Sequence, residues 1–223
     1  MDIWYNLAKS ILRAYVTLFF DSIHVLGKSD LPEGPKVIVA NHTNLTDGFV
    51  LPFVIKERLH YLIQADAFTL PVIGRLLALA DQIPVNIGRG LEALEAAKVR
   101  LSWGHSVVIF PEGRLNDGRS LHRAGVGAAR LAAESGATIV PVGFFVPDQY
   151  ARWIKGHFHG REALARWQFG GKCFVKIGDS WDIKAILQEN MNYRELRRLT
   201  EKLMARIAEL VHQAQDEARR MGF

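Results

Sequence analysis

The sequence predicts a single α/β domain, with a mixed, largely parallel sheet flanked by helices and preceded by an N-terminal amphipathic helix. Short apolar runs with the length of buried strands alternate with segments whose apolar residues recur at helical spacing. The length of 223 residues suits one domain that buries its own core. Hydrophobic residues make up 49% of the chain and charged residues 23%, which is the balance of a globular protein and not of a disordered one.

The first 24 residues are expected to form the N-terminal helix. Its apolar positions are Ile3, Trp4, Leu7, Ile11, Ala14, Tyr15, Leu18 and Phe19. Lys9 and Arg13 interrupt this pattern, no run of about 20 uninterrupted apolar residues exists and no cleavable signal pattern follows, so a transmembrane helix is not expected. The helix either lies in a membrane interface or covers the core of its own domain. The predicted division is therefore a membrane-interface helix at 1–24 and an α/β domain at 25–223.

Six apolar runs are the expected strands of the domain. They lie at 37–40, 59–63, 83–85, 106–110, 139–142 and 173–177. The fifth run contains Pro141, which has no N–H to donate to a neighbouring strand. This run is therefore expected at a sheet edge or at a bulge.

Three further helices are expected at 91–101, 125–135 and 193–220. Gly104 and Gly136 stand where the first two of these helices should end. Asn192 and Glu195 have the spacing of a capping box at the start of the last helix. The apolar stripe of that helix is expected to pack on the core.

The positive charge of the chain is concentrated in its last third. Residues 1–149 hold 14 of the 28 basic and 14 of the 23 acidic residues, so the whole excess of +5 lies in 150–223. Such an excess suits an anionic membrane surface, an acidic carrier or a nucleic acid. The segment 143–158 interleaves aromatic residues with Arg152 and Lys155, which fits either a membrane contact or the lining of a core or acyl tunnel.

The first candidate site is the segment Asn41-His42-Thr43-Asn44-Leu45-Thr46-Asp47, directly after the run at 37–40. Histidine takes up a proton near neutral pH, and a carboxylate beside its other ring nitrogen fixes the tautomer. On one continuous helix, His42 and Asp47 would face apart. They can meet if His42 lies in the loop that leaves the strand and Asp47 in the first turn of a helix.

The second candidate site, Phe110-Pro111-Glu112-Gly113, follows the run at 106–110 and places a carboxylate at the carboxyl end of a strand. The segment from Gly113 to Ser120 also differs by one residue from the phosphate-binding loop of nucleotide-binding proteins, because Arg119 stands in the lysine position. A nucleotide-binding protein is therefore a distant alternative.

A third candidate is Arg89, which follows the run at 83–85 and precedes a helix. An arginine near helix N-terminal amides makes a plausible cradle for phosphate or carboxylate. A structural turn is equally compatible with the same residues.

Taken in order, these segments resemble the glycerolipid acyltransferase family, which includes the 1-acylglycerol-3-phosphate acyltransferases. The NHxxxxD block of the family is matched by Asn41, His42 and Asp47, and its FPEG block by Phe110 through Gly113. Blocks that read IPV and IVPV follow at 83–85 and 139–142, and the resemblance covers roughly 25–180. The arginines of the family's second and third blocks are shifted here: Ile87 and Leu115 stand in their positions, with Arg89 and Arg114 nearby.

The resemblance implies transfer of a fatty acyl group from an acyl-coenzyme A or acyl-carrier-protein thioester to a hydroxyl of a lysophospholipid such as 1-acylglycerol-3-phosphate, in phospholipid biosynthesis. It makes His42 the general base and Asp47 its orienting partner. No G-x-S-x-G segment is present and Cys173, the only cysteine, lies in a strand-like run, so direct transfer without an acyl-enzyme is expected. A single cysteine also excludes an internal disulfide and a cysteine-based zinc site.

The remaining candidate residues are substrate contacts: Asn41, Arg89, Glu112, Gly113 and Arg114. No metal, no cofactor beyond the thioester and no nucleic-acid partner are expected, and His157 and His159 are expected in a loop and not at a metal. The resemblance implies a peripheral membrane protein on the cytoplasmic face, whose partners are the lysolipid, the thioester and the membrane surface. Two alternatives remain, namely a different lipid or glycolipid acceptor and a lipid-binding module without activity.

Overall fold

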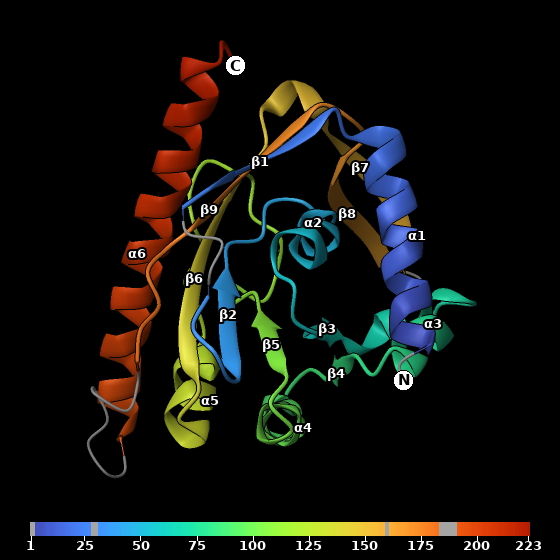
Figure 1. Ribbon diagram of the computed structural model, residues 1–223. Coiled ribbons are helices and arrows are strands. Elements are labelled where there is room, and N and C mark those ends of the chain that lie inside the picture. The colour runs from blue at the N-terminus through green and yellow to red at the C-terminus, as the bar shows by residue number, and fades with distance from the viewer. Residues whose placement is uncertain (1–2, 28–30, 159–160, 183–190) are drawn as a thin grey trace.

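A seven-stranded sheet forms the centre of the molecule in the computed structural model, which describes residues 3–27, 31–158, 161–182 and 191–223 (Figure 1). The strands in spatial order are β1 (Ser22–Leu26), β9 (Lys172–Ile177), β6 (Thr138–Phe145), β2 (Lys36–Ala40), β5 (Ser106–Ile109), β3 (Leu59–Gln64) and β4 (Ile83–Val85). Every neighbouring pair is parallel except β6 and β9. The predicted α/β class with a mixed, largely parallel sheet is confirmed.

Helices cover both faces of the sheet. They are α1 (Ile3–Phe19), α2 (Asp47–Val54), α3 (Ile73–Leu79), α4 (Gly90–Ser102), α5 (Gly127–Ser135) and α6 (Tyr193–Arg220), with short 3₁₀ turns at Ala65–Thr69 and Asp148–Tyr150. Val37 and Val39 of β2 pack under α4, α5 and α6, whereas Ile38 and Ala40 pack under α2 on the other face. The four successive residues from Val37 to Ala40 are therefore all apolar, because both faces of the strand are buried.

The long helix α6 confirms its predicted start and its predicted core stripe. The Asn192 side chain accepts hydrogen bonds from the backbone N–H groups of Arg194 and Glu195, and the Glu195 carboxylate accepts one from the Asn192 N–H. The stripe is buried along the whole helix. It approaches β6 so closely that a Cβ on Gly143 would lie 2.6 Å from the carbonyl carbon of Leu210. The second half of α6 thus runs beside the carboxyl end of β6 (Figure 1).

Pro141 lies inside the sheet, so the expectation that its strand forms an edge is wrong. Strand β6 has neighbours on both sides, β2 and β9. The expected alternative, a bulge, is present on the opposite chain segment. Val142 pairs with Ile177 and Ile139 with Trp181, so the segment facing Pro141 carries one extra residue. The missing N–H of Pro141 falls at this interruption of the ladder.

Helix α3 and strands β1, β7 (Ala151–Phe158) and β8 (Arg161–Gln168) have no counterpart in the sequence analysis. Strand β1 follows α1 after a short turn and pairs in parallel with β9, so the predicted boundary at residue 24 falls inside a strand of the sheet. Strands β7 and β8 form a separate antiparallel hairpin. The segment 143–158 is divided between the end of β6 and strand β7. Phe144 on β6 is buried, whereas Trp153 on β7 is exposed.

Helix α1 lies on the surface and has no buried residue. Two tyrosines attach one side of it to the domain. Tyr5 accepts a hydrogen bond from the backbone N–H of Leu59 at 3.1 Å, and the Tyr15 hydroxyl donates to the backbone carbonyl of Gln168 and accepts from the indole of Trp167. Its exposed large apolar residues are Ile3, Trp4, Leu7, Ile11, Leu18 and Phe19. Of the helices in the described residues, none has the length and apolar character needed to cross a bilayer.

Candidate active site

Two loops meet at the carboxyl edge of the sheet because the strands that precede them are parallel neighbours. Val39 of β2 is paired with Ile109 of β5, so the chain leaves both strands at the same level. The loop after β2 carries His42, and the loop after β5 carries Phe110 through Gly113. Residues 70 positions apart in the sequence thereby come into direct contact.

His42 and Asp47 form a hydrogen-bonded pair. His42 lies in the loop and Asp47 is the first residue of α2, the arrangement predicted from their spacing. His42 Nδ1 lies 3.3 Å from Asp47 Oδ2. A carboxylate only accepts, so Nδ1 carries the proton and Nε2 is the basic nitrogen. The imidazole stacks on the Phe110 ring with 4.0 Å between centroids, and its side chain is 17% exposed.

Asp47 is held by the backbone of its own loop. Its Oδ2 accepts hydrogen bonds from the backbone N–H groups of Thr43 and Asn44, both at 2.8 Å, and the residue is buried. An acid at the first position of a helix also faces the positive end of the helix dipole. The carboxylate is therefore fixed in place before any substrate binds, and it fixes the imidazole in turn.

Glu112 connects the two loops. Its buried carboxylate accepts from the backbone N–H of His42 at 3.0 Å and from the backbone N–H of His122 at 2.6 Å. The side-chain NH₂ of Asn116 also donates to both carboxylate oxygens, at 2.8 and 2.9 Å. These contacts occupy both oxygens. The Glu112 carboxylate thus lies between the two loops, and its hydrogen bonds are made within the protein. The expectation from the sequence was a contact with a substrate.

Asn116 is a site residue that the sequence analysis missed. It is buried, its amide donates to Glu112, its backbone N–H donates to the His42 carbonyl at 2.8 Å, and its Oδ1 accepts from the Gly118 N–H at 2.8 Å. The third block of the family usually reads FPEGTRS, and the available signal was that Asn116 stands in the position of its serine. Asparagine supplies the donors that Glu112 needs and the acceptor that the following turn needs.

Asn41 has a comparable bonding role toward β6. Its side-chain amide exchanges hydrogen bonds with the backbone of Phe144, donating to the carbonyl at 3.0 Å and accepting from the N–H at 2.7 Å. Both polar atoms of this buried side chain are thereby used. The residue connects the loop that carries His42 to the neighbouring strand.

The two arginines expected to contact an anion lie outside this network. Arg89 is exposed at the start of α4 and pairs with Glu92. It follows β4, which is separated from β2 by β5 and β3. Arg114 is closer, since its Nε donates to the ring of His122 at 3.2 Å. Gly113 has a positive φ of 68°, and no atom lies within 4 Å of the position that a Cβ would take.

Two alternative chemistries are not supported by the local structure. A phosphate-binding loop needs a helix that begins at its end, but the chain after Ser120 is irregular and α5 begins at Gly127, so the nucleotide-binding alternative is wrong. Cys173 is buried in β9, and burial together with the charge of Asp47 raises the pKa of its thiol well above the ordinary value. It is thus a poor nucleophile.

The potential metal ligands of the residues that the structure describes are dispersed. In this part of the chain no group of three or more histidine, cysteine, aspartate or glutamate side chains has a metal-binding arrangement. His157 belongs to strand β7, so the expectation that it lies in a loop is wrong, and its side chain and the whole of His159 lie outside the described residues.

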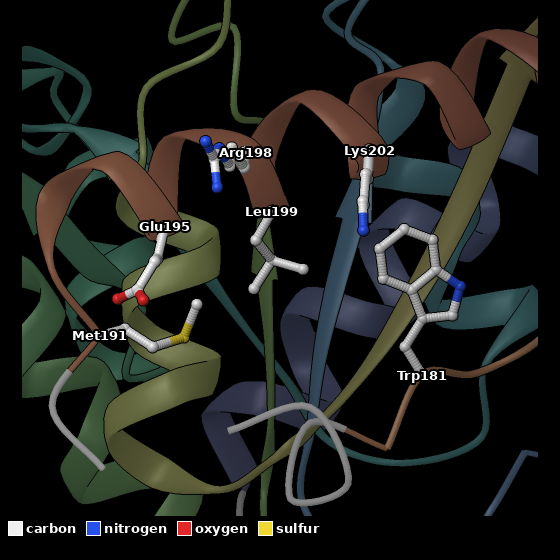
Figure 2. Close-up of a pocket in the computed structure, with 6 residues that line it drawn as sticks. All are labelled: Trp181, Met191, Glu195, Arg198, Leu199 and Lys202. Atoms are coloured by element: carbon white, nitrogen blue, oxygen red, sulfur yellow. The ribbon is translucent and has the colours of Figure 1, made fainter. Parts of the chain in front are cut away.

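A cavity of about 480 Å³ lies at the opposite edge of the sheet (Figure 2). It is lined by Trp181, Met191, Glu195, Arg198, Leu199 and Lys202. Trp181 pairs with Ile139, near the start of β6, whereas His42 follows the end of β2. This cavity is therefore remote from the histidine.

The comparisons with known proteins confirm the resemblance to the glycerolipid acyltransferase family. A family model described as Acyltransferase matches residues 22–144. The chain is 28% identical over 128 residues to a 1-acyl-sn-glycerol-3-phosphate acyltransferase of Chlamydomonas reinhardtii, covering 55% of this chain and 38% of that protein. It is 30% identical over 138 residues to a chloroplastic protein of the same name from Arabidopsis thaliana, covering 59% and 38%. The chain thus spans well under half the length of these two relatives.

A bacterial relative and a solved structure match over more of their length. The 1-acyl-sn-glycerol-3-phosphate acyltransferase of Haemophilus influenzae is 26% identical over 179 residues, which is 78% of this chain and 69% of that protein. The crystal structure of a 1-acyl-sn-glycerophosphate acyltransferase from Thermotoga maritima has a TM-score of 0.68 at 22% identity, covering 92% of this chain and 79% of that one. This likeness shows that the fold is shared.

The enclosure of Glu112 predicts that its charge matters to stability. In Glu112→Gln, an NH₂ group would face two N–H donors whichever way the amide turns, and each buried donor left unmet costs about 1–3 kcal/mol. The free energy of unfolding in urea should fall by about that amount or more. The matched control is Glu201→Gln on the exposed side of α6, which should change it by less than about 0.5 kcal/mol. Equal stability of the two variants would contradict the bonding role of Glu112.

Proposed function

We propose, since the chain belongs to the acyltransferase family, that it transfers a fatty acyl group from an acyl-coenzyme A or acyl-carrier-protein thioester to a hydroxyl of a lysophospholipid such as 1-acylglycerol-3-phosphate. The observation that carries the proposal is the hydrogen-bonded pair of His42 and Asp47 beside the loop of Phe110–Gly113. The names of the relatives support the acceptor class. The place of the reaction would be phospholipid biosynthesis.

In this proposal His42 is the general base and Asp47 orients it. Nε2 takes the proton of the acceptor hydroxyl while its oxygen attacks the thioester carbonyl carbon. The tetrahedral intermediate then collapses, the C–S bond breaks and the imidazolium returns the proton to the thiolate. General-base catalysis of this kind contributes roughly 10²–10⁴-fold to the rate. Asp47 stabilises the charge that develops on the ring, as the acid does in hydrolase triads.

The other candidate residues take two roles. Asn41 and Glu112 position the loops, because their polar atoms are bonded within the protein. Gly113 leaves open space beside the loop, and Arg89 and Arg114 are the proposed contacts to an anionic group of a substrate. The chain needs no cofactor beyond the thioester and no metal in this scheme, and nucleic acid is not among its partners.

Two other functions remain as alternatives. A different lipid or glycolipid acceptor is compatible with the shifted arginines. A lipid-binding module without activity is less favoured, since such a module has no need for a histidine held by a buried carboxylate. Thioester turnover separates the second alternative from the proposal, and a panel of lysolipid acceptors separates the first.

We further propose that the protein works at a membrane surface, on the cytoplasmic face, without spanning the bilayer. The exposed apolar side of α1 supports this, with Leu18 77% exposed and Trp4 and Ile11 beside the same surface. Lys9 and Arg13 can extend to lipid head groups. The segment 1–24 then acts as the interface helix of the domain at 25–223, although its last residues belong to the sheet.

The first functional prediction concerns the catalytic pair. His42→Ala should abolish acyl transfer in a thioester assay, because the general base is lost. The circular dichroism spectrum should stay unchanged, because the backbone bonds of residue 42 to Glu112 and Asn116 are retained. Asp47→Asn should lower kcat by orders of magnitude, since the tautomer is no longer fixed. His24→Gln on β1 is the control and should retain activity. Near-normal turnover by purified His42→Ala would disprove the mechanism.

The second prediction concerns Arg89 and Arg114. Loss of a charge-assisted contact costs about 1.5–3 kcal/mol, so the KM for a phosphate-bearing acceptor should rise roughly ten- to a hundredfold in each alanine variant. Arg130→Ala on α5, whose side chain faces Glu134, serves as the control. Wild-type kinetics of both variants with every phosphorylated substrate would place the anion contacts elsewhere.

The third prediction concerns the membrane surface. Wild-type protein should float with anionic vesicles, and the double substitution of Ile11 and Leu18 by Glu should sharply reduce flotation, because it places charge on the apolar side. Val99→Glu on α4 changes another exposed apolar residue, serves as the control and should float like wild type. Deletion of residues 1–20 gives a second readout. Undiminished flotation of the folded double variant would remove α1 from the membrane contact.

A further inference from the structure

A second cavity, of about 530 Å³, lies at the same edge of the sheet as His42. Asn41 and Thr43, the residues on either side of His42, line it, and so does Asn116. Its other walls are the irregular loop after Asn116, the hairpin strand β8 and the second half of α6. Ligand pockets have volumes of this size, and this one adjoins both loops of the candidate active site.

Arg166 of β8 is the charged group built into this cavity. Its side chain is only 4% exposed, and it pairs with Asp148, whose carboxylate is 95% exposed. The guanidinium also lies against Gly118, where an added Cβ would be 3.0 Å from Nη1. The backbone carbonyl of Arg166 accepts from the N–H of Leu45 at 2.8 Å, which holds β8 to the loop of His42. Arginine is rarely buried unless a partner compensates its charge.

Two further arginines and a histidine reach the same cavity from separate elements. Arg119 comes from the loop, and Arg219 and His212 come from α6. The acidic groups on the wall are Asp148 and Asp117. Asp117 accepts from the backbone N–H of Arg119 at 2.9 Å, and this and a further backbone bond lower the pKa of its carboxyl. Arg219 is near Asp216 at 3.1 Å, but both side chains are largely exposed. Exposed pairs of this kind are weak.

The strand order places Arg89 and the α6 wall of this cavity on opposite sides of β2, the strand that precedes His42. Strand β6 and α6 lie on one side of β2, whereas β5, β3 and β4 lead to Arg89 on the other. Transfer from a coenzyme A or carrier-protein thioester to a phosphate-bearing lysolipid brings two phosphorylated substrates to one histidine. Each substrate then needs an anion contact of its own.

We infer that the cavity lined by Arg119, Arg166 and Arg219 is a second anion subsite, which holds a phosphate group of one of the two substrates. This inference rests on the proposed function. The phosphate belongs either to the coenzyme A or phosphopantetheine part of the donor or to the head group of the acceptor. Arginine side chains bind phosphate through paired N–H donors, and a partly enclosed site strengthens these contacts.

The test compares Arg119→Gln and Arg219→Gln, whose side chains lie at the rim, with Arg130→Gln on α5 as the control. Steady-state kinetics with varied donor and varied acceptor should show the KM of one substrate raised about ten- to a hundredfold, with kcat nearly unchanged. A rise for the donor alone assigns the cavity to the donor phosphate, and a rise for the acceptor alone assigns it to the head group. An unchanged KM for both substrates, or a fall in kcat alone, would overturn the inference.

Calorimetry separates this inference from the proposed function, because it needs no turnover. Adenosine 3′,5′-bisphosphate represents the donor, and glycerol 3-phosphate represents the acceptor. At least one probe should bind the wild type and lose about tenfold or more in affinity in both glutamine variants and in Arg166→Met. Absence of binding to the wild type, or equal binding by the variants at the rim, would exclude the subsite even if acyl transfer is found. The two rim variants keep the test valid if Arg166→Met does not fold.

Discussion

The parallel pairing of β2 and β5 is the constraint on which the rest of the site depends. It brings two loops to one level, and Glu112 then joins them through hydrogen bonds to the backbone of His42 and to Asn116. A buried carboxylate is costly unless donors surround it. The loops can therefore adopt few arrangements that keep Glu112 satisfied, and those arrangements also fix the imidazole over Phe110. The same group that costs free energy when buried thus gives the site its rigidity.

Most of the sheet and its covering helices were predictable from local pattern. The strands that the sequence analysis predicted are apolar runs, as in β2, where both faces are buried. The start of α6 is marked by the capping box of Asn192 and Glu195. Strand β1 was missed because it directly follows an apolar helix and is only partly buried. The hairpin was missed because β7 and β8 pair only with each other and polar residues interrupt both strands irregularly, so neither an apolar run nor a regular alternation marks them.

The pairing of His42 with Asp47 was predictable from their spacing, and the groups that hold this pair were not. The separation of five residues from His42 to Asp47 suffices to argue for a loop followed by a helical turn, which the structure has. The contacts of Glu112, Asn116 and Arg166 connect segments far apart in the chain, and no local pattern carries that information. The bulge opposite Pro141 is a similar case, because the proline indicates an interruption but not which neighbouring segment supplies it.

The burial of Cys173 makes its thiol a probe for local opening of the structure around β9. This thiol, the only one in the chain, lies in β9 on the face of the sheet covered by α2. A small alkylating reagent reaches it only when β9 or its covering layer separates, and reaction also requires the thiolate. The rate at which the thiol is modified therefore reports how often β9 or its covering layer opens. Because the chain has no second thiol, the signal belongs to that one strand.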